Sequence, residues 1–122
     1  MYNPVTMDHF LNPRNPGPLT DADGMGQADN GKCGDLTRMW VKIAPDGTLS
    51  DVRFQAFGSG AAIAAASVTT VLSQGRPAAE ALAIGAAEVE AAMDGLPPMK
   101  KNCAVMAAEA LHRALAAAGV TE

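Results

Sequence analysis

Apolar and polar side chains alternate along two neighbouring stretches near the middle of the chain. Residues 36–43 place apolar side chains on every second position, and residues 52–56 do the same. A period of two is typical of strands with one buried and one solvated face. The turn sequence at 45–47 between the two stretches predicts an antiparallel hairpin. The buried side is expected to carry Met39, Val41, Ile43, Val52, Phe54 and Ala56, and the solvated side Arg38, Lys42, Arg53 and Gln55.

The period changes to that of helices after Gly58. Ser59 to about Ser73 is rich in alanine, and the small side chains favour a helix packed closely on the sheet. In the last helix, Glu109 and Arg113 have the i,i+4 spacing of a surface ion pair. Its apolar stripe is expected to hold Val105, Ala108, Leu111 and Leu115. This last helix is predicted at residues 102–118. The other helices are predicted at residues 1–15, centred on 5–11 and stopped by Pro13, at 78–84 and at 87–93.

Two segments break these patterns. Residues 16–35 are rich in Gly, Pro, Asp and Asn, which predicts a loop with room for one edge strand, and residues 95–98 predict an extended stretch. The expected fold is α+β, with a small antiparallel sheet covered on one side by helices. The length predicts a single domain over residues 1–122.

Composition narrows the functional classes. Of the 59 hydrophobic residues 25 are alanine, so the core is thin, and a bound metal or partner is a plausible source of stability. The net charge of −4 and the five aromatic residues argue against nucleic acid as a partner. The short apolar runs and the lack of a signal pattern predict a cytoplasmic protein without a membrane segment.

Candidate chemistry gathers where strands end and helices begin. Cys33 and Asp35 precede the first predicted strand, Ser59 opens the alanine-rich helix, and Cys103 opens the last one. A helix N-terminus favours thiolate over thiol, which suits a ligand or a nucleophile at Cys103. Cytosolic cysteines are also often plainly structural, so spacing alone leaves both interpretations of the two cysteines open.

Four distinctive motifs stand in order along the chain. They are Asp8-His9-Phe10-Leu11-Asn12-Pro13-Arg14-Asn15, Cys33-Gly34-Asp35, the run from Phe54 to Ala64, and Leu96-Pro97-Pro98-Met99-Lys100 leading to Cys103. Together they make the sequence similar to the IscU/NifU family of iron–sulfur cluster scaffolds. The resemblance implies the same α+β fold and a site to which Cys33, Asp35 and Cys103 contribute, with Cys103 also accepting sulfur from a cysteine desulfurase.

Two positions depart from the family pattern. Ser59 stands where the family has its middle cysteine, and Asn102 stands where it has a histidine. A hydroxyl and an amide are poor ligands beside thiolate and imidazole, so the metal set falls to Cys33, Asp35 and Cys103. Both residue types are good helix N-caps, and capping is the preferred interpretation of each.

Three functions fit this reduced set. The first is a scaffold, not an enzyme, that carries iron or a transient [2Fe–2S] cluster as a monomer or weak homodimer. The second is a zinc-dependent sulfur acceptor, because two thiolates and a carboxylate leave the fourth tetrahedral position open. The third is a partner-binding module without metal. For this third function the resemblance implies that the proline-containing segment with Leu96, Pro97, Pro98, Met99 and Lys100 binds an Hsp70-type chaperone, because prolines hold an extended shape that suits docking. Without the other motifs, the same segment is an ordinary loop between helices.

Overall fold

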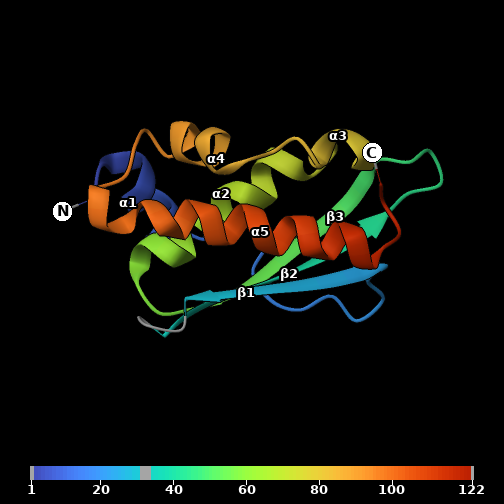
Figure 1. The fold of residues 1–122 in the computed structure, drawn as a ribbon, viewed down its shortest axis with the longest axis horizontal. Coiled ribbons are helices and arrows are strands. Elements are labelled where there is room, and N and C mark those ends of the chain that lie inside the picture. The colour runs from blue at the N-terminus through green and yellow to red at the C-terminus, as the bar shows by residue number, and fades with distance from the viewer. Residues whose placement is uncertain (1, 31–33, 122) are drawn as a thin grey trace.

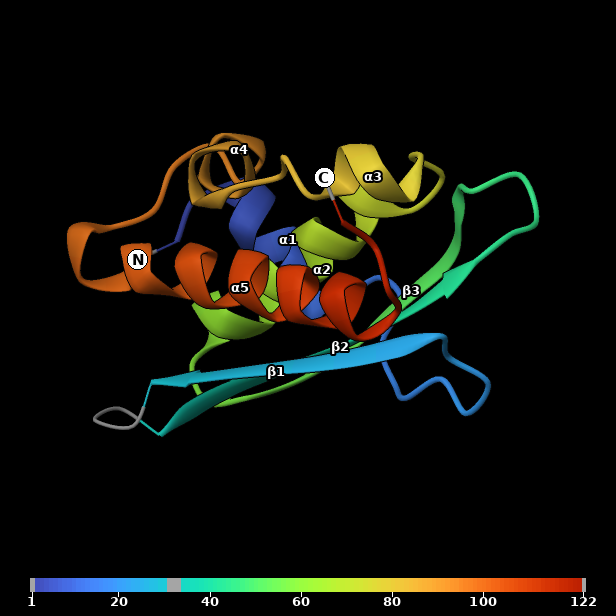
Figure 2. The same cartoon turned by 45° about the vertical axis from the view of Figure 1, so that its right-hand side comes forward.

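A three-stranded antiparallel sheet lies beneath five α-helices in the computed structural model, which describes residues 2–30 and 34–121 (Figure 1). The strands are β1 (Gly24–Asn30), β2 (Asp35–Ile43) and β3 (Leu49–Phe57), in the order β1-β2-β3. Figure 2 shows the helices on one face of this sheet. The predicted fold class is therefore confirmed. The helices are α1 (Pro4–Leu11), α2 (Gly60–Ser73), α3 (Ala78–Ala81), α4 (Ala86–Ala92) and α5 (Lys101–Ala117).

The predicted hairpin is confirmed as β2 and β3. Met39 pairs with Phe54 and Val41 with Val52, and all four side chains are buried against the helices. Arg38 faces the other side of the sheet, where its guanidinium donates to the Gln27 side chain of β1 at 2.8 Å. The pleat thus separates a core face from a polar face, as the alternating pattern predicted.

The edge strand β1 packs directly on α5 through glycine. An added Cβ on Gly26 would lie 2.3 Å from the Ala114 amide nitrogen, and one on Gly24 would lie 2.2 Å from the Ala114 carbonyl oxygen. Both distances are far below any real contact, so the helix can reach the strand only where side chains are missing. Of the predicted loop at 16–35, residues 24–30 form the edge strand for which the prediction left room.

Alanine fills much of the space between the sheet, α2 and α5. Ala61, Ala65, Ala107 and Ala110 are fully buried. The buried hydroxyls of Thr69, Thr70 and Ser73 in α2 donate to carbonyls of the preceding turn, as Thr69 does to Ala65 at 2.8 Å. Small side chains and locally satisfied hydroxyls let the two helices approach closely, which is how a thin core is still tightly packed.

Three predictions about the helices need correction. Val105 of the predicted stripe is 45% exposed, because α5 packs against both the sheet and α2. The other predicted members are buried, and the buried face also includes Met106, Ala107 and Ala110. The helix predicted at 78–84 ends at Ala81. The stretch predicted as extended at 95–98 ends at Pro97, because Pro98–Lys100 form a 3₁₀ turn, η1, that runs into α5.

Helix α1 begins later than predicted, at a proline in its first turn. The Asn3 side chain caps it by accepting from the Thr6 amide at 2.9 Å.

The predicted Glu109–Arg113 ion pair on α5 is confirmed. No helix among the described residues is long and apolar enough to cross a membrane.

Candidate functional site

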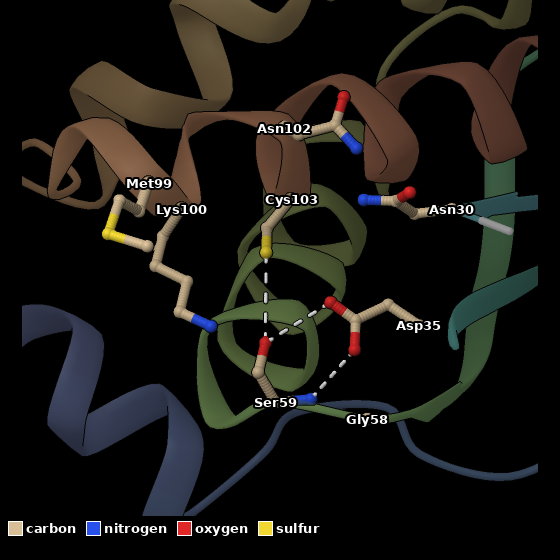
Figure 3. A pocket seen from close by; sticks show the side chains of 8 residues that line it. All are labelled: Asn30, Asp35, Gly58, Ser59, Met99, Lys100, Asn102 and Cys103. Atoms are coloured by element: carbon tan, nitrogen blue, oxygen red, sulfur yellow. Dashed lines mark hydrogen bonds between the residues drawn. The ribbon is translucent and has the colours of Figure 1, made fainter. Parts of the chain in front are cut away.

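Three functional side chains meet where β2 begins and where α2 and α5 begin (Figure 3). The Ser59 hydroxyl oxygen lies 3.4 Å from Asp35 Oδ2 and 3.8 Å from Cys103 Sγ. Asp35 and Cys103 are 68 positions apart in the sequence, so the fold itself brings them to one place. The structure thus brings Asp35, Ser59 and Cys103 together at one place.

Asp35 is held by the start of α2. Its side chain is buried, with the residue 8% exposed, and its Oδ1 accepts a hydrogen bond from the Ser59 amide at 3.1 Å. The Ser59 hydroxyl donates to Oδ2. Hydrogen bonds from an amide and a hydroxyl compensate part of the cost of burying a carboxylate, and they fix its orientation.

Ser59 is the N-cap of α2, as predicted. Its backbone is extended, with φ −70° and ψ 158°, and its hydroxyl accepts from the Ala62 amide at 3.3 Å. The same hydroxyl also contacts both Asp35 and Cys103. Ser59 therefore both caps α2 and belongs to the site, whereas the sequence favoured the capping role alone.

Gly58 makes the approach of Asp35 possible, and sequence reasoning missed it. Its φ is +127°, and an added Cβ would lie 1.9 Å from Asp35 Oδ1. Both the backbone conformation and the lack of a side chain are needed at this position. Its place between the end of β3 and the cap of α2 was the signal that could have identified it.

Cys103 is the third residue of α5 and is 4% exposed. Its predicted position in the first turn of the last helix is confirmed. The predicted cap Asn102 is wrong: α5 begins at Lys101, Lys100 is the N-cap residue, and Asn102 is an exposed residue of the first turn. The reason is the 3₁₀ turn, which continues directly into α5 and moves the helix start toward the N-terminus.

The predicted ligand Cys33 lies outside the described residues. Within residues 2–30 and 34–121, no three His, Cys, Asp or Glu side chains gather closely enough to hold a metal ion. Asp35 and Cys103 are the predicted ligands that the structure places, at the same cavity. The three-residue ligand set stays a prediction.

A cavity of about 300 Å³ opens beside these groups and is called here the Cys103 cavity. Asn30 and Asn102 contribute amides to its wall, while Lys100 contributes an ammonium group that points into it (Figure 3). The eight residues that line it are Asn30, Asp35, Gly58, Ser59, Met99, Lys100, Asn102 and Cys103.

The predicted partner segment 96–100 is divided between core and surface. Leu96 is buried at 8% exposure, whereas Met99 is 93% exposed. A second pocket of about 540 Å³, called here the Pro97 pocket, lies against the segment and is lined by Tyr2, Met7, Pro97, Pro98, Met99 and Lys100. Met99 and Lys100 line both cavities, so this segment joins the Pro97 pocket to the Cys103 cavity.

The two histidines have structural contacts. His9 Nδ1 lies 2.7 Å from the Ser67 hydroxyl, and burial lowers the pKa of His9 below its usual 6.5, with the nearby Arg14 charge acting in the same direction. His112 Nε2 lies 2.6 Å from the Ile84 carbonyl oxygen, a short hydrogen bond between α5 and the segment before α4. Both contacts tie helices or their connecting segments together.

Comparison with known proteins identifies the family of this chain. The family model described as the NifU-like N terminal domain matches residues 1–118. The chain belongs to this family. A solved structure shares the fold: the N-terminal part of a nitrogen-fixing NifU-like protein from Brucella abortus superposes with a TM-score of 0.73 at 16% identity, covering 96% of this chain and 93% of that one.

Two curated relatives of this NifU-like domain are named iron-sulfur cluster assembly scaffold protein IscU. The relative from Aquifex aeolicus is 43% identical over 115 residues, covering 93% of this chain and 73% of the relative. The one from Escherichia coli is 34% identical over 118 residues, covering 94% and 91%. The similarity thus extends over nearly the whole chain.

Proposed function

We propose that this NifU-like chain is a scaffold on which iron–sulfur clusters are assembled, and that it is not itself an enzyme. The observation that carries the proposal is the meeting of Asp35, Ser59 and Cys103 at one cavity. The Ser59 hydroxyl lies 3.4 Å from Asp35 Oδ2 and 3.8 Å from Cys103 Sγ, so this one hydroxyl joins the proposed carboxylate and thiolate ligands at the cavity wall.

The donor set fits a cargo that is bound and then released. Cys33, two positions before Asp35, and Cys103 supply thiolates, and Asp35 supplies a carboxylate. A [2Fe–2S] cluster takes four protein ligands, so these three hold it incompletely unless Ser59, water or a second chain completes the set. An incompletely held cluster exchanges readily, which suits a scaffold that passes its cargo on.

Cys103 is the residue that we propose receives sulfur from a cysteine desulfurase. It lies in the first turn of a helix and at the wall of the Cys103 cavity, beside the Ser59 hydroxyl. Free amide groups at a helix start favour the thiolate, which is the nucleophilic form. The neighbouring carboxylate of Asp35 then provides an oxygen ligand for iron close to the delivered sulfur.

An Hsp70-type chaperone is the proposed partner of the 96–100 segment. The Met99 side chain is almost fully exposed beside the largely apolar Pro97 pocket. Exposed apolar side chains beside a pocket are typical of protein contact sites. Because Leu96 is buried, its role in this contact is to anchor the segment rather than to touch the partner.

Anaerobic reconstitution tests the scaffold proposal. Purified protein is incubated with iron and sulfide, or with iron, cysteine and a cysteine desulfurase, and bound iron and visible absorption are measured after desalting. We expect charge-transfer bands that are lost in Cys33→Ala and Cys103→Ala and weakened in Asp35→Asn. The matched control is Asp51→Asn, which removes a carboxylate on β3 that pairs with Arg53 away from the cavity.

Other outcomes separate the remaining functions. Stoichiometric zinc bound through the same three residues, with sulfur accepted at Cys103 and no iron–sulfur bands, favours the zinc-dependent sulfur acceptor. Binding of neither metal, together with chaperone binding that Met99→Ala weakens, favours a partner-binding module. Bands that survive in both cysteine variants overturn the proposed site.

A further inference from the structure

The Cys103 cavity contains one feature that the scaffold proposal does not use, the side chain of Lys100. Among the eight described residues that line the cavity, Lys100 carries the positive charge and Asp35 is the carboxylate. Figure 3 shows the Lys100 ammonium group directed toward Ser59, on the opposite side from Asp35 in this view. A cation therefore faces the space in front of the Cys103 sulfur.

The backbone holds Lys100 in this position. Its amide donates to the Pro97 carbonyl at 2.8 Å, and it closes the 3₁₀ turn that the two prolines begin. Proline fixes φ, so little backbone freedom is left in the turn. The direction in which the side chain of Lys100 leaves the backbone is thus set by a rigid segment at the start of α5.

The ammonium group of Lys100 has no counterion in the part of the chain that the structure describes. None of the ion pairs or side-chain hydrogen bonds between residues 2–30 and 34–121 includes it, whereas the adjacent Lys101 pairs with Glu90 at 2.7 Å. The two neighbouring lysines therefore differ in role. Lys101 is neutralised on α4, and Lys100 presents its charge to the cavity.

Sulfur transfer to Cys103 would place an anion in this space. The Cys103 thiolate attacks the outer sulfur of a donor persulfide R–S–SH, an S–S bond to Cys103 forms, the donor S–S bond breaks, and the donor leaves as its thiolate. The new Cys103 persulfide then loses its proton to water, which leaves the negative charge on the outer sulfur. Asp35 repels this charge, whereas a cation attracts it.

We propose, resting on the sulfur transfer proposed above, that Lys100 is a positioning residue whose ammonium group binds the anionic outer sulfur of a persulfide on Cys103. The ammonium keeps this sulfur in the Cys103 cavity, close to the Asp35 carboxylate that we propose as an iron ligand. Lys100 thereby links sulfur receipt to cluster assembly without itself being a ligand.

The first test measures the charge beside Cys103 and needs neither iron nor a partner. In a Cys33→Ser background Cys103 is the single thiol, and its alkylation rates with anionic iodoacetate and neutral iodoacetamide are compared at one pH. The ratio of the two rates cancels the thiolate fraction. We expect Lys100→Gln to lower this ratio about threefold to tenfold, Lys100→Arg to retain it, and the matched control Lys101→Gln to leave it unchanged.

The second test follows the sulfur. The same proteins are loaded with inorganic polysulfide and desalted, and loss of the added sulfur atom is followed by intact-protein mass spectrometry, with circular dichroism confirming the fold. We expect Lys100→Gln to lose the persulfide several-fold faster than the parent and Lys101→Gln. The proposal is overturned if Lys100→Gln has the same alkylation ratio as the Cys33→Ser parent. It is also overturned if Lys100→Gln loses the persulfide at the same rate as that parent.

The two proposals fail separately. Suppose that the Cys33→Ser parent retains polysulfide-derived sulfur longer than its Lys100→Gln variant, but that the wild-type chain accepts no sulfur from a desulfurase and forms no iron–sulfur bands. The proposed function is then wrong, and the role of Lys100 stands.

Discussion

Replacing Gly58 with alanine is expected to disrupt the candidate site through a single methyl group. The new Cβ would lie 1.9 Å from Asp35 Oδ1 and 2.7 Å from its Cγ, and the backbone φ of +127° disfavours any residue with a side chain. The Asp35 carboxylate must therefore move away from the Ser59 amide that it accepts from.

The size of the effect follows from two contributions. A side chain forced into a sparsely populated backbone region costs about 1–3 kcal/mol. Pulling a buried carboxylate away from its donors costs roughly another 1–3 kcal/mol. The expected loss in the free energy of unfolding is about 2–6 kcal/mol, a large part of the 5–15 kcal/mol that is typical of a whole domain.

Urea denaturation followed by the fluorescence of Trp40, the only tryptophan, measures this loss. The matched control is Gly47→Ala, because Gly47 also has a positive φ, +89°, but an added Cβ there meets nothing within 4 Å. The control carries the backbone cost alone. The difference between the two variants isolates the contact with Asp35, which we expect to be about 1–3 kcal/mol.

A double-mutant cycle with Asp35→Ala completes the experiment. Removing the carboxylate takes away the two nearest atoms, so Gly58→Ala should cost about 1–3 kcal/mol less in that background than in the wild type. If Gly58→Ala costs no more than Gly47→Ala, and the cycle shows coupling below about 0.5 kcal/mol, the close approach of Gly58 and Asp35 does not shape the site.

Three further predictions concern other contacts. Ser59→Ala should lower the free energy of unfolding by about 1 kcal/mol through loss of the helix cap. Ser59→Cys adds a thiolate beside Cys103, so this variant should retain more cluster after desalting than the wild-type protein does. Equal retention by the variant and the wild type contradicts the assignment of this site. Because burial lowers the pKa of His9, the neutral form of His9 favours folding, and stability should fall as pH drops below 6.5. Urea denaturation at pH 7.5 and 5.5, on either side of about 6.5, measures this fall. The free energy of unfolding should drop less between these two pH values in His9→Asn than in the wild type. Gly26→Ala should cost about 3 kcal/mol or abolish folding, whereas the control Gly85→Ala, where a Cβ meets nothing within 4 Å, should be nearly neutral; similar melts for the two variants would refute the close packing of β1 on α5.

The sequence predicted elements whose pattern comes from one buried face. The hairpin of β2 and β3 and the start of α2 were placed because apolar spacing and turn residues act locally. The strand β1 gave no such signal, since Gly24 and Gly26 are small in order to admit α5. Small residues at 24, 26 and 28 do repeat with a period of two, which is the trace of a strand packed on a helix backbone.

The site was predicted in part, and its missing parts depend on tertiary contacts. Asp35, Ser59 and Cys103 were identified from their positions at the ends of elements. The hydrogen bonds between Asp35 and Ser59 depend on how the chain turns at Gly58, which no local pattern encodes. Asn102 was misplaced because a 3₁₀ turn and a helix can join without a capping side chain.

The seating of α5 on β1 has a mechanical consequence for Cys103. Cys103 and Ala114 are eleven positions apart on one helix, a span of about 16 Å. Because main chain rests on main chain at the Ala114 end, the helix has no compressible layer beneath it there. A bulkier residue at Gly26 would push α5 away from β1 near Ala114 and tilt the helix. The tilt would move the Cys103 thiol relative to Asp35, so a substitution remote from the Cys103 cavity would change the reactivity of Cys103 toward sulfur.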